Sequence, residues 1–149
     1  MGEIRDFRDL RVYRAAHAAA MRVFDVSRAF PPDERYSLTS QIRRSSRSAA
    51  ANAVEAWERR RYPASFVAKL VDAEAEAAET RVFLDFALSC GYIDPATHRS
   101  LDAEYDRLIR RIVRMMREPE RWNPGRASGR TAGPARARPG HHPKVPTTI

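Results

Sequence analysis

The stretch DPATHRSLDAEYDRLIRRIVRMM, residues 94 to 116, decides the fold. Asp94 is suited to cap a helix N-terminus, and Pro95 suits the first helical turn that follows the cap. Apolar residues then recur every three or four positions, which places them on one face of a helix. They are Leu101, Tyr105, Leu108, Ile112 and Met115. Pro119 follows the pattern, so the sequence predicts one amphipathic helix that ends before it.

Three further segments of the same kind precede this one. The sequence has no glycine between Gly2 and Gly91, and prolines divide it into segments rich in Ala, Arg and Glu, which favour helix. We expect helices over about 8–30, from 33 or 37 to 60, and over 63–90. Their apolar or small stripes are Val12, Ala16, Ala19, Val23, Val26 and Phe30; Leu38, Ile42, Ser45, Ala49, Asn52 and Ala56; and Phe66, Leu70, Ala73, Ala77, Thr80, Leu84 and Ala87. Since short loops favour antiparallel neighbours, the prediction is an all-α, antiparallel up-down four-helix bundle.

The charge and composition change after residue 122. The chain has 27 Lys and Arg against 19 Asp and Glu, a net charge of +8, and every acidic residue precedes position 123. We therefore assign residues 1–122 to the bundle and expect residues 123–149, rich in Arg, Pro and Gly, to form a disordered basic tail. The single cysteine, Cys90, fits a reducing compartment, and no apolar run is long enough to span a membrane. Both observations favour a cytoplasmic protein.

Two of the predicted helices carry more apolar residues than are needed for one buried stripe. The additional positions are Tyr13, Ala20 and Phe24 in the first helix and Val67, Val82, Phe83 and Phe86 in the third. Surplus apolar surface on a soluble protein often forms an interface, so we expect a homo-oligomer. A thicker core within one chain is the alternative.

The sequence lacks the usual sets of catalytic residues. No histidine lies in a Glu-x-x-His or His-Glu-x-x-His pattern, and no glycine-rich phosphate loop is present. Cys90 lies at a predicted helix C-terminus, where the helix dipole disfavours a thiolate. The adjacent His141 and His142 could bind a metal only weakly. We therefore expect no enzymatic activity, no cofactor and no metal site.

Two predicted helices carry arginines at helical spacing. Arg43, Arg44 and Arg47 form one set, and Arg107, Arg110, Arg111 and Arg114 form the other. Residues three and four apart are neighbours on a helix, so each set makes a cationic strip suited to phosphates. A solvated surface without a ligand is the alternative, and Asp102, Glu104 and Asp106 could neutralise the second strip. The first strip has no acidic residue between positions 34 and 55 and is the stronger candidate.

Asn52 and Glu55 are the polar residues that stand out in the second helix. Asn52 falls on the apolar stripe, where a polar group needs hydrogen-bond partners and can fix the helix register. Glu55 lies about one turn further on. With no nucleophile or metal set nearby, we assign both to structure rather than to catalysis.

Several of these features together resemble a known family. They are Asp9-Leu10-x-Val12-Tyr13-x-Ala15, Phe30-Pro31-x-x-Glu34-x-Tyr36-x-Leu38-x-x-Gln41-Ile42-Arg43-Arg44, Ser48-x-x-x-Asn52-x-x-Glu55, then Glu79, Leu84 and Gly91-Tyr92-Ile93. This order resembles the four-helix bundle proteins encoded in 23S ribosomal RNA intervening sequences, and the accessory protein of diversity-generating retroelements is similar. The chain departs from the family pattern at Ala56, where glycine is usual, and at Ala75-Glu76, where a small pair is usual.

The resemblance implies a ring-shaped homopentamer without catalytic residues. In the retroelement relative it also implies a basic surface that binds nucleic acid and a reverse transcriptase. Together with the arginine strips, this predicts a pentameric bundle that binds nucleic acid, with RNA favoured over DNA. The alternative is a scaffold for protein–protein interaction that binds no nucleic acid.

Overall fold

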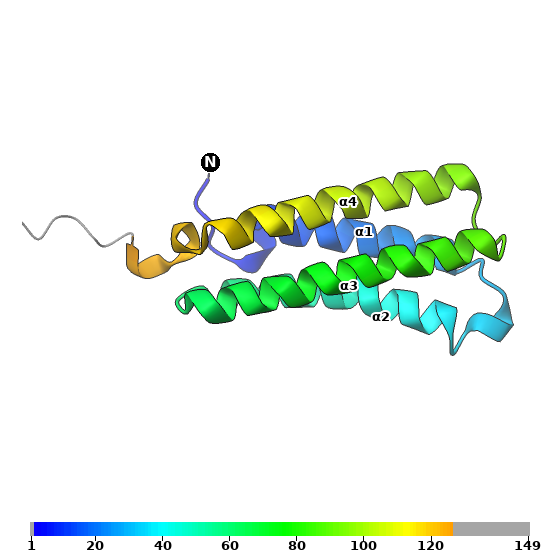
Figure 1. The fold of residues 1–149 in the computed structure, drawn as a ribbon, viewed down its shortest axis with the longest axis horizontal. Helices are drawn as coiled ribbons and strands as arrows, with labels where there is room; N and C mark the ends of the chain where they lie inside the picture. The colour runs from blue at the N-terminus through cyan, green and yellow to red at the C-terminus, as the bar shows by residue number, and fades with distance from the viewer. Residues whose placement is uncertain (1, 127–149) are drawn as a thin grey trace, which may run out of the picture.

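The computed structural model describes residues 2–126 and contains four long antiparallel helices (Figure 1). They are α1 (Arg11–Ser27), α2 (Leu38–Glu58), α3 (Pro63–Ser89) and α4 (Pro95–Arg117). Short 3-10 helices accompany them: η1 (Phe7–Asp9), η2 (Pro32–Glu34), η3 (Pro119–Trp122) and η4 (Pro124–Arg126). The described residues contain no strand. The predicted all-α, antiparallel up-down bundle is therefore confirmed.

The helix ends differ from the prediction by a few residues. α1 begins at Arg11 because residues 7–9 form η1, which Asp6 and Asp9 stabilise by a reciprocal capping box. α1 ends at Ser27, before Phe30. The second helix begins at Leu38, since residues 32–34 form η2. Of the predicted tail, residues 123–126 are described and include η4, whereas residues 127–149 lie outside the described part of the chain.

The predicted Asp94 cap is present at the α3–α4 connection, and Gly91 adds a second capping feature there. Oδ1 of Asp94 accepts a hydrogen bond from the backbone N–H of Thr97 at 2.6 Å. Gly91 has a φ of +75°, a left-handed conformation that glycine adopts without a steric penalty. The N–H of the next residue, Tyr92, donates to the carbonyl of Ala87 at 2.8 Å, which closes the C-terminus of α3. The chain can thus reverse within a short connection.

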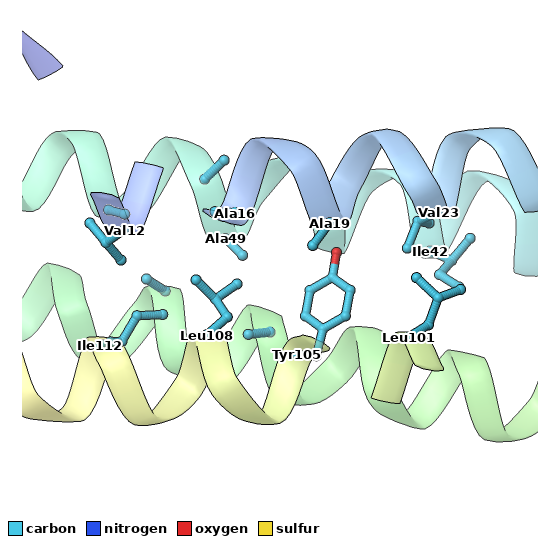
Figure 2. Packing of buried hydrophobic residues seen from close by; sticks show 14 of the residues in the cluster. Val12, Ala16, Ala19, Val23, Ile42, Ala49, Leu101, Tyr105, Leu108 and Ile112 are labelled. Atoms are coloured by element: carbon cyan, nitrogen blue, oxygen red, sulfur yellow. The ribbon is translucent and has the colours of Figure 1, made fainter. Parts of the chain in front are cut away.

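The predicted stripes form the core. In Figure 2, Val12, Ala16, Ala19 and Val23 of α1 lie opposite Ile112, Leu108, Tyr105 and Leu101 of α4, in that order. The alanines of α1 thus face the large side chains of Leu108 and Tyr105 in α4, and this pairing of small with large residues fills the space between the two helices. All but two members of the four predicted stripes are buried. The exceptions, Val26 and Asn52, are half-buried.

The helices are arranged so that α2 and α4 lie diagonally across the bundle. α2 makes its most extensive interface with α3 and also packs on α1, whereas α4 packs on α3 and α1. Alanine and serine on the inner face of α2 permit close packing there. Within that interface, the buried hydroxyls of Ser45 and Thr80 hydrogen-bond at 2.7 Å.

Candidate nucleic-acid interface

The three candidate arginines of α2 point toward two different neighbouring helices. Arg43 is half-buried, and its Nε donates to Oγ of Ser27 in α1 at 2.8 Å. Arg47, one turn further along, is exposed and also lies on the α1 side. Arg44 instead reaches α3. The three arginines of the predicted strip are therefore neighbours along α2, but Arg43 and Arg47 lie on the α1 side and Arg44 lies on the α3 side.

Arg44 is neutralised by carboxylates of α3. Its guanidinium hydrogen-bonds Glu79 at 2.9 and 3.0 Å and Glu76 at 3.3 Å. These hydrogen bonds raise the pKa of Arg44. The inference that this strip lacks acidic partners is therefore wrong for Arg44. It considered only acids within α2, whereas the partners lie on the adjacent helix.

The other arginines on this side converge on one aromatic ring. The guanidinium carbons of Arg28, Arg43 and Arg47 lie 5.8, 4.8 and 6.0 Å from the ring centroid of Phe24. Cation–π attraction holds each guanidinium against the ring. Among residues 2–126, none of these three arginines forms an ion pair with a carboxylate. Three like charges are thus held close together without a counter-charge.

A fourth arginine extends this surface toward the α1–α2 connection. Arg35 lies at the C-terminal end of η2, with its guanidinium carbon 5.3 Å from the ring centroid of Tyr36. Like the three arginines around Phe24, it has no carboxylate partner within the described residues. We call Arg28, Arg35, Arg43 and Arg47 the arginine face. It combines unpaired guanidinium groups with two aromatic rings.

The candidate strip on α4 has a different character. Arg110 pairs with Asp106 of the same helix at 3.0 Å, Arg107 and Arg114 are exposed, and Arg111 is half-buried. Two of the three acidic residues that could neutralise this strip pair with arginines of other helices instead. Asp102 receives two hydrogen bonds from Arg81 of α3, and Glu104 receives one from Arg22 of α1.

The fold does not bring the two strips together. α1 and α3 both lie between α2 and α4, so the strips occupy opposite sides of the bundle. Any one stretch of nucleic acid that contacted both would have to pass around the protein. The arginine face is the less neutralised of the two surfaces, because none of its four arginines has a carboxylate partner among the described residues, whereas Arg110 of the α4 strip pairs with Asp106.

Asn52 and Glu55 lie further along α2. The side-chain amide of Asn52 donates to the carbonyl and the hydroxyl of Ser48, at 3.0 and 3.1 Å, within its own helix. Glu55 is exposed and pairs with Lys69 of α3 at 3.0 Å. Asn52 therefore makes no hydrogen bond to a neighbouring helix among the described residues, and the interhelical contact comes from Glu55.

The potential metal ligands and nucleophiles of the described chain do not cluster. Within residues 2–126, no group of three or more His, Cys, Asp or Glu side chains could hold a metal ion. His98 bonds Asp85 at 2.7 Å, and Cys90 is a free, exposed thiol. His141 and His142 lie outside the described residues. Every helix in the described part of the chain is too short or too polar to cross a lipid bilayer.

Sequence reasoning missed four residues of this surface: Phe24, Arg28, Arg35 and Tyr36. Phe24 falls on an apolar seam of α1 and therefore resembles a core residue, but its half-buried ring lies against three arginine guanidinium groups. Arg28 follows Phe24 by one helical turn, which is a signal that the pattern does contain. Arg35 and Tyr36 lie in the connection before α2, where helical periodicity gives no information.

The fold and this surface define an antiparallel four-helix bundle protein with a basic face. Comparison with known families identifies the chain further: the model described as 23S rRNA-intervening sequence protein matches residues 8–114. The chain belongs to this family. The match covers all four helices except the last residues of α4.

A solved structure has the same fold. It is a protein of unknown function from the S23 ribosomal protein family of Bacteroides thetaiotaomicron VPI-5482. The TM-score is 0.64 and the sequence identity is 24%, over 70% of this chain and 97% of that one. At this identity the similarity supports the fold alone. No curated protein matches the chain.

Proposed function

We propose that this chain is a non-enzymatic, homo-oligomeric bundle of the cytoplasm that binds nucleic acid, RNA in preference to DNA, through the arginine face. The supporting observation is the convergence of Arg28, Arg43 and Arg47 on Phe24 without a carboxylate partner among residues 2–126. Like charges this close repel one another, and a phosphate between them would relieve the repulsion. Guanidinium groups also match phosphate oxygens by bidentate hydrogen bonding.

Two further features support this choice of ligand. The family is described by an intervening sequence of 23S rRNA, and for that reason we take RNA as the nucleic acid to test first. The exposed Arg107 and Arg114 of α4 give a second cationic strip on the opposite side of the bundle, where another RNA segment could bind. Such phosphate contacts release counterions, so binding should weaken steeply as the salt concentration rises.

The proposal can be tested by fluorescence anisotropy with a labelled RNA. The test variant combines Arg28→Ala, Arg35→Ala and Arg47→Ala, and it leaves the hydrogen bond between Arg43 and Ser27 intact. We expect weaker binding between about 50 and about 200 mM salt. The negative slope of log affinity against log salt should become less steep, by about 0.7 for each phosphate of a single strand that the variant no longer neutralises.

The matched control removes three charges at the other end of the bundle. It combines Arg11→Ala, Arg59→Ala and Arg61→Ala, all at exposed positions. This control should bind RNA nearly as tightly as the wild type. Equal loss of affinity in both triple variants would show that net charge alone, rather than the arginine face, determines binding.

The proposal of a homo-oligomer is based on the outer face of α3. Val71, Val82 and Phe86 are 48%, 50% and 57% exposed there. Alanines complete a stripe with helical spacing: Ala68, Val71, Ala75, Ala78, Val82 and Phe86. This outer stripe lies opposite the buried stripe of α3, so the helix is apolar on both sides. A helix with that pattern is usually covered on both sides, and a second copy of the chain supplies a cover.

Sedimentation analysis tests this part of the proposal. The pentamer that the family resemblance implies would have five times the 17.0 kDa mass of one chain. Val82→Asp with Phe86→Asp should dissociate the assembly and leave the helical circular dichroism spectrum unchanged. A control with Ala96→Asp and Ala103→Asp, at exposed positions of α4, should remain assembled. A monomeric wild type at tens of micromolar would contradict the proposal.

The same outer face of α3 favours one alternative function. If a different protein, such as a reverse transcriptase, covered the stripe, the bundle would be an interaction scaffold and its arginines would only keep it soluble. Capture of one partner that survives nuclease treatment and is lost in the Val82→Asp, Phe86→Asp variant would favour that function.

A further inference from the structure

The arginine face borders a depression at the start of α2. Its volume is about 580 Å³, and it is a shallow depression that is largely open to solvent. Arg43, Arg44 and Arg47 line it along the helix, and Arg35 and Tyr36 line it at the end nearest the α1–α2 connection. The depression thus has cationic groups along its length and an aromatic ring at one end.

Tyr36 is the most exposed of the large hydrophobic residues described, with 84% of its surface accessible. Folding does not explain this position, because a ring that lies at the surface beside the Arg35 guanidinium contributes little to the core. Its backbone is nevertheless held firmly. Glu34 accepts hydrogen bonds from the Ser37 hydroxyl at 2.7 Å and from the Leu38 N–H at 3.0 Å, on the C-terminal side of Tyr36. The ring is therefore available to a ligand and is presented by an ordered turn.

An exposed ring beside guanidinium groups is the chemistry that recognises a nucleotide. A base stacks on the aromatic face, and the flanking phosphates pair with arginine. In a duplex the base faces are covered by neighbouring bases, so a ring at the surface cannot stack on them. The ligand class that uses both parts of this depression is therefore an unpaired nucleotide within a strand.

We propose that the depression binds one unpaired nucleotide of a single-stranded RNA, with its base stacked on Tyr36 and the flanking phosphates of the strand near Arg43 and Arg47. The inference rests on the proposed function, since it specifies which RNA the arginine face accepts. It adds a preference that the arginines alone would not give. A purely electrostatic surface follows phosphate charge density and gives no preference for the single strand, whereas the Tyr36 stack selects it.

The test measures binding of a labelled, unstructured RNA of about 12 nucleotides, a length typical of single-strand sites, and of the same RNA in a duplex. Tyr36→Ala should weaken single-strand binding by roughly 5- to 150-fold, the loss expected for one base–aromatic stack. Tyr36→Phe should bind like the wild type because it keeps the ring. The matched control is Tyr62→Ala at the other end of the bundle, where the tyrosine is 69% exposed, and it should have no effect.

A second measurement locates the contact directly. Irradiation with RNA that contains 5-bromouracil should crosslink Tyr36, in the tryptic peptide of residues 36–43. If Tyr36→Ala bound the single strand as the wild type does, while the triple arginine variant did not, the stacking inference would be overturned and the proposed function would stand. Equal wild-type affinity for duplex and single strand would overturn it as well. A wild type that bound neither RNA would refute both proposals.

Discussion

The Tyr92 hydroxyl donates a hydrogen bond to Oε1 of Glu34 at 3.2 Å, which joins the connection before α4 to the connection before α2. The other carboxylate oxygen, Oε2, accepts the hydrogen bonds that fix the first turn of α2. Phe30 supports the same contact, with its ring centroid 5.5 Å from that of Tyr92. Because Arg35 and Tyr36 directly follow Glu34, this carboxylate holds one end of the proposed nucleotide site in place.

Replacing Tyr92 with Phe removes only this hydroxyl. We expect Tyr92→Phe to lower the free energy of unfolding by about 1 kcal/mol, the usual net value of one hydrogen bond. Urea denaturation measures the change. The control is Tyr13→Phe, because the hydroxyl of Tyr13 makes no hydrogen bond within the described residues. If both variants unfolded at the same urea concentration, the bond between Tyr92 and Glu34 would contribute nothing in solution.

Glu34 also predicts a dependence of stability on pH. Hydrogen bonds from the Ser37 hydroxyl and the Leu38 N–H hold the pKa of Glu34 below its ordinary value of 4.5, with a smaller contribution from Tyr92, and partial burial opposes them. A depressed pKa stabilises the fold fully above the unfolded-state pKa, and this stabilisation is lost as the pH falls through the folded-state pKa.

The comparison of wild type with Glu34→Gln isolates this effect. The glutamine cannot ionise, so the wild type should be the more stable of the two near neutral pH. The difference in unfolding free energy should shrink from about pH 5 downward, as Glu34 is protonated. A difference that stayed constant over that range would show that the carboxylate charge is not stabilised by its hydrogen bonds.

The buried seams of this fold were predictable from sequence for a physical reason. Helical spacing alone places residues such as Leu101 and Ile112 on one face, and that face must be hidden from water. The helix ends were less predictable, because the 3-10 turns at 7–9 and 32–34 depend on local caps. The site was predicted only in part. Spacing puts Arg43 and Arg44 on a surface, but it cannot say that α1 receives one and α3 the other.

A buried hydrogen bond between α2 and α3 gives a third prediction. Ser45 and Thr80 are fully buried and share one bond, and Thr80 also donates to the carbonyl of Glu76 at 2.9 Å. Ser45→Ala and Thr80→Val should each lower the unfolding free energy by about 1–3 kcal/mol, because each leaves a buried hydroxyl or carbonyl with fewer partners. The double variant should lose less unfolding free energy than the two single variants together, because neither hydroxyl is then left without the other. Strict additivity of the two losses would refute direct coupling.

Tyr105 predicts a substitution that does not weaken the fold. Its ring is fully buried between α1 and α4, and its hydroxyl has no partner in hydrogen-bonding geometry among the described residues. Burial raises the pKa of this phenol, and the nearby charge of Glu104 raises it further. Tyr105→Phe should therefore be neutral or stabilise by up to about 1 kcal/mol, whereas Tyr105→Ala should lower stability by about 3–5 kcal/mol. A clear loss in Tyr105→Phe would mean that the hydroxyl is bonded in solution.

The last prediction separates a structural arginine from a binding one on the same helix. Arg44 hydrogen-bonds Glu76 and Glu79, so Arg44→Ala should lower the unfolding free energy by about 0.5–1 kcal/mol and change RNA affinity little. Arg47 has no carboxylate partner in the described structure, so Arg47→Ala should leave stability within about 0.5 kcal/mol and weaken RNA binding with a smaller salt slope. Urea denaturation and anisotropy on the same preparations give both values. If the two variants lost RNA affinity equally, Arg44 would contact RNA despite its hydrogen bonds to Glu76 and Glu79 of α3. The site would then be the whole cationic strip of α2 rather than the side that faces α1.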